Sequence, residues 1–126
     1  MTPLWRAAQE RQREAAALGF DWPDLDGVLA KLREELAELE DATQNPDATQ
    51  RVAQCRHELG DLLFVLAHLS RRLEVDPESA LNDALARFNA RFSEVMRDAE
   101  QLPPLGNPAR LDAMEARWQA AKRRGL

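Results

Sequence analysis

The chain has little of the material from which β-sheets and disulfide-linked folds are built. Its 126 residues include no tyrosine, one cysteine, five glycines and three serines, and runs of β-branched residues are almost absent. β-branched and aromatic residues favour strands, whereas Ala, Leu, Glu, Arg and Gln, which dominate here, favour helices. The composition therefore predicts an all-α protein.

The single cysteine, Cys55, excludes an internal disulfide and a multi-cysteine zinc site, and it fits a reducing compartment. The longest apolar run, residues 62–67, is far too short to span a bilayer. Residues 1–6 lead into a polar segment and do not resemble a secretory signal. We therefore expect a cytoplasmic protein with no membrane partner.

Basic residues are also fewer than acidic ones: 17 Lys and Arg stand against 22 Asp and Glu, which gives a formal net charge of −5. Such a chain repels a polyanion, so we expect no nucleic acid polymer as partner. An anionic small molecule remains compatible with this charge if a divalent cation accompanies it.

The length and the hydrophobic content of 44% predict one domain, residues 1–126, with a modest core. Pro, Gly and Asp signals divide it into about five helices of a helical bundle. The third helix is apolar nearly all round between Leu59 and Leu69, which predicts a buried central helix. The expected helices lie at about residues 3–18, 24–45, 48–73, 77–95 and 109–124, with an exposed loop at 101–108.

The fourth helix is expected to bury one apolar face in the core. Together the helices carry more apolar faces than one small bundle needs, so we expect a homodimer or homotetramer. The residues of the fourth helix's face are Leu81, Leu85, Phe88, Phe92 and Val95.

Two pairs of carboxylates stand out against this background. Glu35 precedes Glu38 by three residues, and Glu58 precedes Asp61 by three. Side chains three apart on a helix project from the same face, so each pair can act as a two-pronged oxygen ligand. Two such helices side by side would bind Mg²⁺, with Mn²⁺ as a second possibility, because these ions select hard oxygen ligands.

Glutamates on a helix are more often a solvated face than a site. Glu58 and Asp61 are different, because they lie at the mouth of the most apolar stretch and flank Gly60, where a neighbouring helix can approach closely. Charges there need cations or hydrogen bonds to stay ionised. The constellation on two helices therefore favours a functional site.

A di-iron bundle would need Glu-x-x-His on two helices, and neither histidine has a Glu at that spacing. His57 is interpreted as a polar neighbour of the site, and His68 as a histidine at the edge of the core. Phosphate-loop, dinucleotide-binding, nucleophile-elbow and zinc signatures are all missing.

Five motifs in order resemble the MazG family of nucleoside triphosphate pyrophosphohydrolases over almost the whole chain. They are nearest to the catalytic C-terminal half of its two-domain members. The resemblance implies an all-α, magnesium-dependent enzyme that cleaves nucleoside triphosphates between the α and β phosphates. Its expected role is nucleotide-pool house-cleaning. The motifs are Gly19-Phe-Asp-Trp22, Lys31-x-x-Glu-Glu-x-x-Glu38, Glu58-x-x-Asp61-Leu-Leu-Phe64, Arg87-Phe-x-x-Arg-Phe92 and Trp118-x-x-x-Lys122.

The resemblance also implies residue roles. Glu34 would be a supporting acid or a water-orienting group, and Trp118 would lie near the base or sugar. Our hypothesis for the chemistry is that Glu38 or Glu34 helps to deprotonate the water that attacks the α phosphorus. Metal ligands would be Glu35, Glu38, Glu58 and Asp61, and phosphate-binding bases would be Lys31, Arg87, Arg91 and Lys122. The sequence departs from the pattern at Ala90, where many relatives have a second basic residue.

Two alternatives stay open. One is a narrower enzyme on the same scaffold that prefers dUTP or dCTP. The other is a non-catalytic helical module that binds a nucleotide or a partner protein through the acidic groove.

Overall fold

The computed structural model describes residues 3–126, and in that range it contains five α-helices and no strand. The all-α class expected from the composition is confirmed. The chain divides into two compact units, residues 1–78 and 79–126, and each is described by itself. Whether the two units act as one domain stays a prediction.

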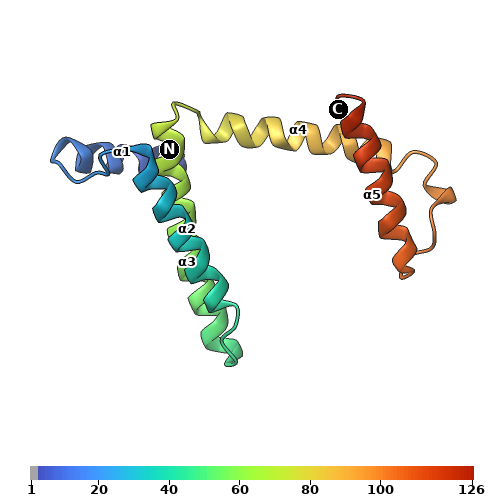
Figure 1. Cartoon of the computed structure of the whole chain (residues 1–126), viewed down its shortest axis with the longest axis horizontal. Coiled ribbons are helices and arrows are strands. Elements are labelled where there is room, and N and C mark those ends of the chain that lie inside the picture. The colour runs from blue at the N-terminus through green and yellow to red at the C-terminus, as the bar shows by residue number, and fades with distance from the viewer. Residues whose placement is uncertain (1–2) are drawn as a thin grey trace. The chain divides into compact units, whose positions relative to one another are not determined.

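The first unit is built on an antiparallel pair of helices, α2 (Leu25–Ala42) and α3 (Ala48–Arg72). They lie side by side along most of their length, joined by a short turn (Figure 1). Each of the two helices is capped by the aspartate directly before it. Asp24 Oδ1 accepts a hydrogen bond from Gly27 N at 2.9 Å, and Asp47 Oδ1 accepts one from Gln50 N at 2.9 Å.

Helix α1 (Leu4–Ala17) packs against α3 through polar side chains. Gln9 Nε2 donates to the carbonyl of Ala67 at 3.0 Å, and Gln12 Nε2 donates to that of Phe64 at 2.9 Å. Both glutamines are buried. The α1–α3 contact is therefore held by side-chain amides as well as by apolar packing.

The second unit contains most of α4 (Pro77–Val95), a 3₁₀ turn (Ala99–Gln101) and α5 (Pro108–Arg123). Pro77 and Pro108 stand at the first helical positions, where a missing N–H does no harm. Arg117 Nη1 donates to the carbonyls of Val95 and Arg97 at 2.8 and 2.6 Å, which ties α5 to the end of α4.

Two burial predictions are wrong for the single chain. Leu59, Leu63 and Phe64 of α3 are exposed, because only α1 and α2 pack extensively on this helix in the described residues. On α4 only Val95 of the predicted face is buried. The other four residues stay exposed, with Leu81 at 63%, even though the Phe88 ring lies 5.5 Å from the Trp118 ring of α5. The prediction of an exposed loop fails at Leu102, directly after the 3₁₀ turn, because this residue is buried.

The buried hydrophobic core of the described residues is consequently small. It consists of Val28, Ala42, Val65, Ala67, Val95, Leu102 and Ala121. No helix in residues 3–126 is both long and apolar enough to cross a membrane.

Candidate active site

The antiparallel pairing of α2 and α3 brings the predicted carboxylates together in the first unit. One oxygen each of Glu35, Glu38 and Glu58 lie within 4.8 Å of one another, with Glu35 and Glu38 on α2 and Glu58 on α3. These separations allow one cation to contact all three residues. Three of the four predicted metal ligands are therefore close enough to share an ion.

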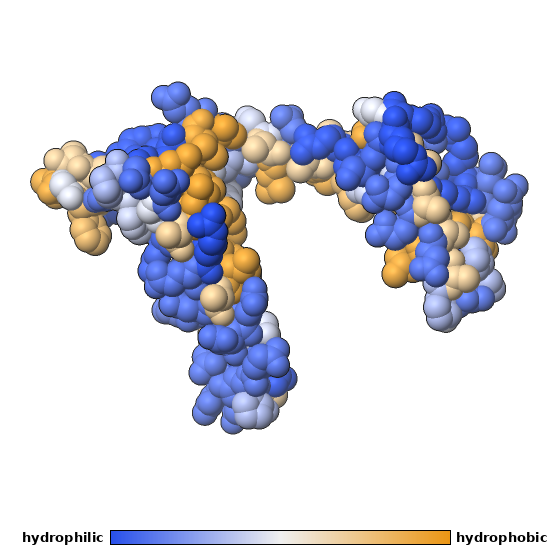
Figure 2. Space-filling model, in the orientation of Figure 1, coloured by the Kyte–Doolittle hydropathy of each residue, from blue (hydrophilic) through white to orange (hydrophobic). Residues whose placement is uncertain are grey.

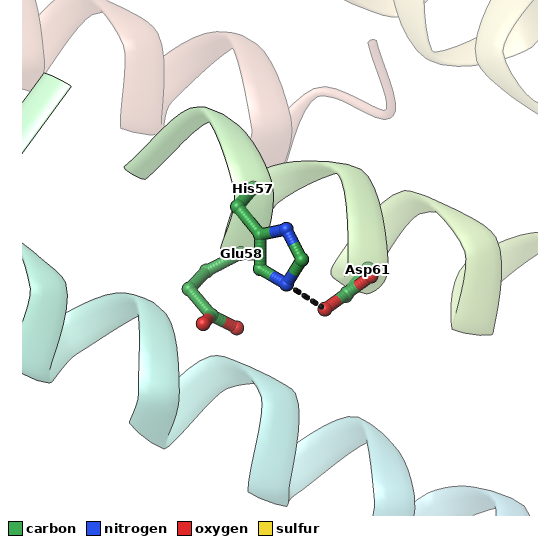
Figure 3. A group of neighbouring side chains, drawn as sticks. All are labelled: His57, Glu58 and Asp61. Atoms are coloured by element: carbon green, nitrogen blue, oxygen red, sulfur yellow. Dashed lines mark ion pairs between the residues drawn. The ribbon is translucent and has the colours of Figure 1, made fainter. Parts of the chain in front are cut away.

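The fourth predicted ligand, Asp61, belongs to an adjoining group. Donor atoms of His57, Glu58 and Asp61 also lie within 4.8 Å of one another, so Glu58 is common to both groups. In Figure 3 the imidazole of His57 points to the carboxylate of Asp61, and His57 Nε2 lies 3.2 Å from Asp61 Oδ2. His57 is thus a neighbour of the site, as the sequence indicated.

Lys31 supplies positive charge next to the acidic groups. Its Nζ atom lies 3.1 Å from Glu35 Oε1 and 3.2 Å from Glu34 Oε1. Hydrogen bonding to Glu35, and next to Glu34, raises the pKa of Lys31 above its usual value. The structure therefore places Lys31 on carboxylates, while its predicted contact with phosphate stays a prediction.

The remaining negative charge changes the protonation of Glu38. A hydrogen bond with Glu58, followed by the negative charge of Glu35, raises the pKa of Glu38 to about 7. A carboxyl group with a pKa near 7 exchanges protons readily at neutral pH. Glu38 is itself exposed, so solvent reaches it directly.

The arrangement fits a divalent cation for a second reason. The side chain of Glu35 is only 7% exposed, and in the described residues Glu35 Oε2 and Glu58 Oε2 are buried oxygens without a hydrogen-bond partner. Buried carboxylate oxygens without partners are strongly unfavourable unless a cation or proton meets them. The donor set, all oxygen in the group of Glu35, Glu38 and Glu58, is the one that Mg²⁺ and Mn²⁺ prefer.

The remaining predicted site residues belong to neither carboxylate group. Glu34 is exposed and pairs with Lys31. In the second unit, the guanidinium carbon of Arg91 lies 5.4 Å from the centroid of the Trp118 ring, and that ring lies 5.5 Å from the ring of Phe88. Arg87 and Lys122 are exposed on the same unit. The roles of Arg87, Arg91, Trp118 and Lys122 stay predictions.

Gly60 does not have the role expected of it. A Cβ added there would meet nothing within 4 Å among the described residues, so no close approach to α3 is found at that point. The close approach occurs at Gly27 instead, where the Trp22 side chain packs on the backbone. A Cβ at Gly27 would lie 2.8 Å from Trp22 Cδ1. The sequence reading missed Gly27, although the motif Gly19-Phe-Asp-Trp22 pointed to the loop that packs on it.

The same loop carries an ionic cluster that the sequence reading also missed. Asp21 Oδ1 lies 3.1 Å from His68 Nε2 and 3.3 Å from Arg72 Nη1. Burial opposes ionisation of Asp21, but the Trp22 N–H and the charges of His68, Arg71 and Arg72 lower its pKa overall. His68, expected at the edge of the core, is buried, and Trp22 meets its ring edge-on at 4.9 Å. This cluster fixes the loop before α2.

Comparison with known proteins agrees with the carboxylate geometry. Residues 25–97, more than half of the chain, match the MazG nucleotide pyrophosphohydrolase domain. The chain belongs to the MazG family. The matched segment contains both carboxylate pairs as well as Lys31, Arg87 and Arg91.

Two curated relatives cover nearly the whole chain. It is 36% identical over 122 residues to the nucleoside triphosphate pyrophosphohydrolase/pyrophosphatase MazG of Thermotoga maritima, covering 97% of this chain and 45% of that protein. It is 37% identical over 126 residues to the nucleoside triphosphate pyrophosphohydrolase of Escherichia coli K12, covering 98% of this chain and 46% of that protein. The MazG-family chain therefore spans about half the length of the curated relatives it matches.

Proposed function

We propose that this chain hydrolyses nucleoside triphosphates between the α and β phosphates, giving the nucleoside monophosphate and pyrophosphate. The observation that carries the proposal is the group formed by Glu35, Glu38 and Glu58, in which two buried carboxylate oxygens lack a partner within the described residues. Family membership and the names of the two relatives support the same reaction.

The proposed cofactor is Mg²⁺, with Mn²⁺ as a substitute, held by Glu35, Glu38, Glu58 and Asp61. When bound, such an ion neutralises charge on the phosphate oxygens and activates water. Its positive charge also explains how an acidic site can bind an anionic nucleotide, because the four carboxylates alone would repel it.

Glu38 is the preferred general base. It belongs to the three-carboxylate group and is open to solvent, whereas Glu34 lies outside both groups and pairs with Lys31. In the proposed step, water attacks the α phosphorus, its proton passes to a carboxylate oxygen of Glu38, and the bond from the α phosphorus to the bridging oxygen breaks. Pyrophosphate is the leaving group.

The second unit is proposed to bind the substrate. Arg87, Arg91 and Lys122 are proposed to contact phosphate groups of the nucleotide, since phosphoryl transfer depends mainly on positioning and charge stabilisation. Trp118 would contact the base or sugar. The guanidinium carbon of Arg91 lies 5.4 Å from the centroid of the Trp118 ring, which places a cation beside an aromatic ring on this unit.

We also propose that two copies of the chain associate through the first unit. A groove of about 620 Å³ runs between α1 and α3 and is lined almost entirely by apolar atoms. In Figure 2 apolar residues gather in a strip on the surface of this unit. The groove is lined by Leu4, Trp5, Ala7, Ala8, Gly60, Leu63, Phe64 and Ala67.

We expect a second copy of the chain to cover the groove between α1 and α3. The buried core of the described residues contains no aromatic side chain, while Phe64 is 50% exposed. A core this small gives limited stability. Burial of the groove against the same surface of another copy would supply the missing apolar contacts.

The reaction is tested by analysing the products formed with Mg²⁺ from a panel of ribonucleoside and deoxyribonucleoside triphosphates. Phosphorus NMR distinguishes monophosphate and pyrophosphate from diphosphate and phosphate. Turnover of dUTP or dCTP alone would support the narrower enzyme. Release of no pyrophosphate from any triphosphate would reject the proposal and leave the binding module.

A further inference from the structure

We propose that His57 is a nitrogen ligand beside the carboxylates, so that this chain binds Mn²⁺ or Co²⁺ more tightly than Mg²⁺. The inference rests on the proposed metal site but not on turnover. It assigns a role to a histidine that the four-carboxylate site does not use. His57 lies on α3, directly before Glu58 and one turn from Asp61.

The spacing of the donors fits one octahedral ion. Two neighbouring ligands at about 2.1 Å from such an ion lie about 3 Å apart, and opposite ligands about 4.2 Å apart. His57 Nε2 and Asp61 Oδ2 are 3.2 Å apart, and Glu58 completes a set whose donor atoms all lie within 4.8 Å. Figure 3 shows the carboxylate of Glu58 on the same side of α3 as the imidazole nitrogen. The 4.8 Å limit is somewhat larger than the separation of opposite ligands, so small side-chain movements would bring the three donor atoms onto one ion.

The surrounding charge favours a cation at this position. Glu58 also belongs to the group of Glu35 and Glu38, and its buried Oε2 atom has no hydrogen-bond partner in residues 3–126. The adjoining Glu35 side chain is nine-tenths buried, and its Oε2 atom is likewise without a partner. An ordinary surface contact between an exposed histidine and an aspartate contributes little and would leave the Glu58 Oε2 atom without a partner.

The imidazole decides which ion is preferred. Mg²⁺ takes oxygen ligands, whereas Mn²⁺, Co²⁺ and other first-row ions also accept imidazole nitrogen, with Co²⁺ binding such sites more tightly than Mn²⁺. The same i, i+4 placement on a helix is used by paired histidines in zinc enzymes. His57 is 72% exposed, so water and ions reach its ring and its replacement leaves the core untouched.

Electron spin-echo measurements on Mn²⁺-loaded protein test the nitrogen directly. Wild-type protein should show imidazole nitrogen coupled to the ion, and His57→Gln should lose that coupling. Calorimetry should find Co²⁺ affinity roughly tenfold or more weaker in His57→Gln, with Mg²⁺ affinity changed less than about threefold. Arg56→Gln, at the neighbouring exposed position, should leave the ratio of the two affinities unchanged.

Absence of nitrogen coupling in the wild type, or equal loss of Co²⁺ and Mg²⁺ affinity in His57→Gln, would overturn the inference. Both measurements are independent of catalysis. Nitrogen coupling without pyrophosphate release would reject the proposed reaction and retain the His57 site. Pyrophosphate release without nitrogen coupling would reject the His57 site and retain the proposed reaction.

Discussion

Lys31 Nζ lies 3.1 Å from Oε1 of Glu35, the most buried carboxylate of the candidate site. The ammonium group therefore offsets part of the charge that a bound cation would neutralise. Glu35 and Lys31 are four residues apart on α2, a spacing at which helical side chains meet. This relationship links the stability of the metal-free protein to its affinity for metal.

Lys31→Met should destabilise the metal-free protein and increase its response to Mg²⁺. Removal of the ammonium leaves Glu35 buried without compensation, which should lower the free energy of unfolding by roughly 1–3 kcal/mol. Saturating Mg²⁺ then replaces the lost charge, so the rise in Tm on adding Mg²⁺ should be larger than in the wild type. Thermal unfolding measured with chelator and with Mg²⁺ checks this. Arg33→Met, an exposed neighbour, should show the wild-type rise, and an unchanged rise in Lys31→Met would contradict the expectation.

Glu38→Gln and Asp61→Asn should abolish turnover while the helices remain intact. Each change removes a negative charge with almost no change of shape, so a loss of at least about 10²-fold in kcat is expected. Circular dichroism and pyrophosphate release measure the two properties separately. Glu40→Gln, an exposed carboxylate on the same helix, should retain wild-type rates. Near-normal rates in both site variants would reject the metal assignment.

The shared protonation of Glu38 predicts a pH dependence of stability. Its pKa is about 7 in the folded metal-free protein, against 4.5 as the ordinary value. Between these values the folded state binds more protons than the unfolded state, so the Glu38 contribution to stability falls as pH rises from about 4.5 to 7. In chelator, the free energy of unfolding of the wild type relative to Glu38→Gln should therefore decline across this window. A difference that is flat or rises with pH would show that Glu38 does not share its proton with Glu58.

The contact between Trp22 and Gly27 predicts an unusual response to alanine. At an open helical position, replacing Gly with Ala stabilises by about 1 kcal/mol. At Gly27 the new Cβ would lie 2.8 Å from Trp22 Cδ1, so Gly27→Ala should destabilise by about 1–3 kcal/mol. In a Trp22→Ala background the same change should cost clearly less, because the ring contact at 2.8 Å is gone and only the Trp22 Cβ contact at 3.2 Å remains. A double-mutant cycle in urea measures this difference, and additivity of the two changes would contradict it.

Local signals made much of the fold predictable. Asp24, Asp47, Pro77 and Asn107–Pro108 begin helices close to the expected residues, because caps and helix-starting prolines act within one turn of the chain. Three-residue spacing likewise placed each carboxylate pair on one face. The short connection between the second and third helices then brought the pairs together.

Contacts between distant segments were not predictable in the same way. The spacing of Asp21 and His68 gives no sign that their side chains meet, since the contact depends on how the loop before α2 returns to α3. Apolar periodicity showed that faces of α3 and α4 require a cover, but it does not tell whether the same chain or another copy supplies it. That is why Phe64 and Phe88 were expected in the core and are found exposed.

Replacement of Phe64 tests whether two copies of the chain associate through the groove between α1 and α3. Phe64→Asp places a charge in the apolar groove between α1 and α3, so it should weaken the dimer by about 100-fold or more in Kd, as loss of a central aromatic contact does. Because Phe64 is 50% exposed in the single chain, the helicity of the variant should survive. Light scattering over a concentration series measures the mass. Leu18→Asp, an exposed leucine outside the groove, should stay dimeric, whereas a monomeric wild type or an unaffected Phe64→Asp dimer would reject this surface as the interface.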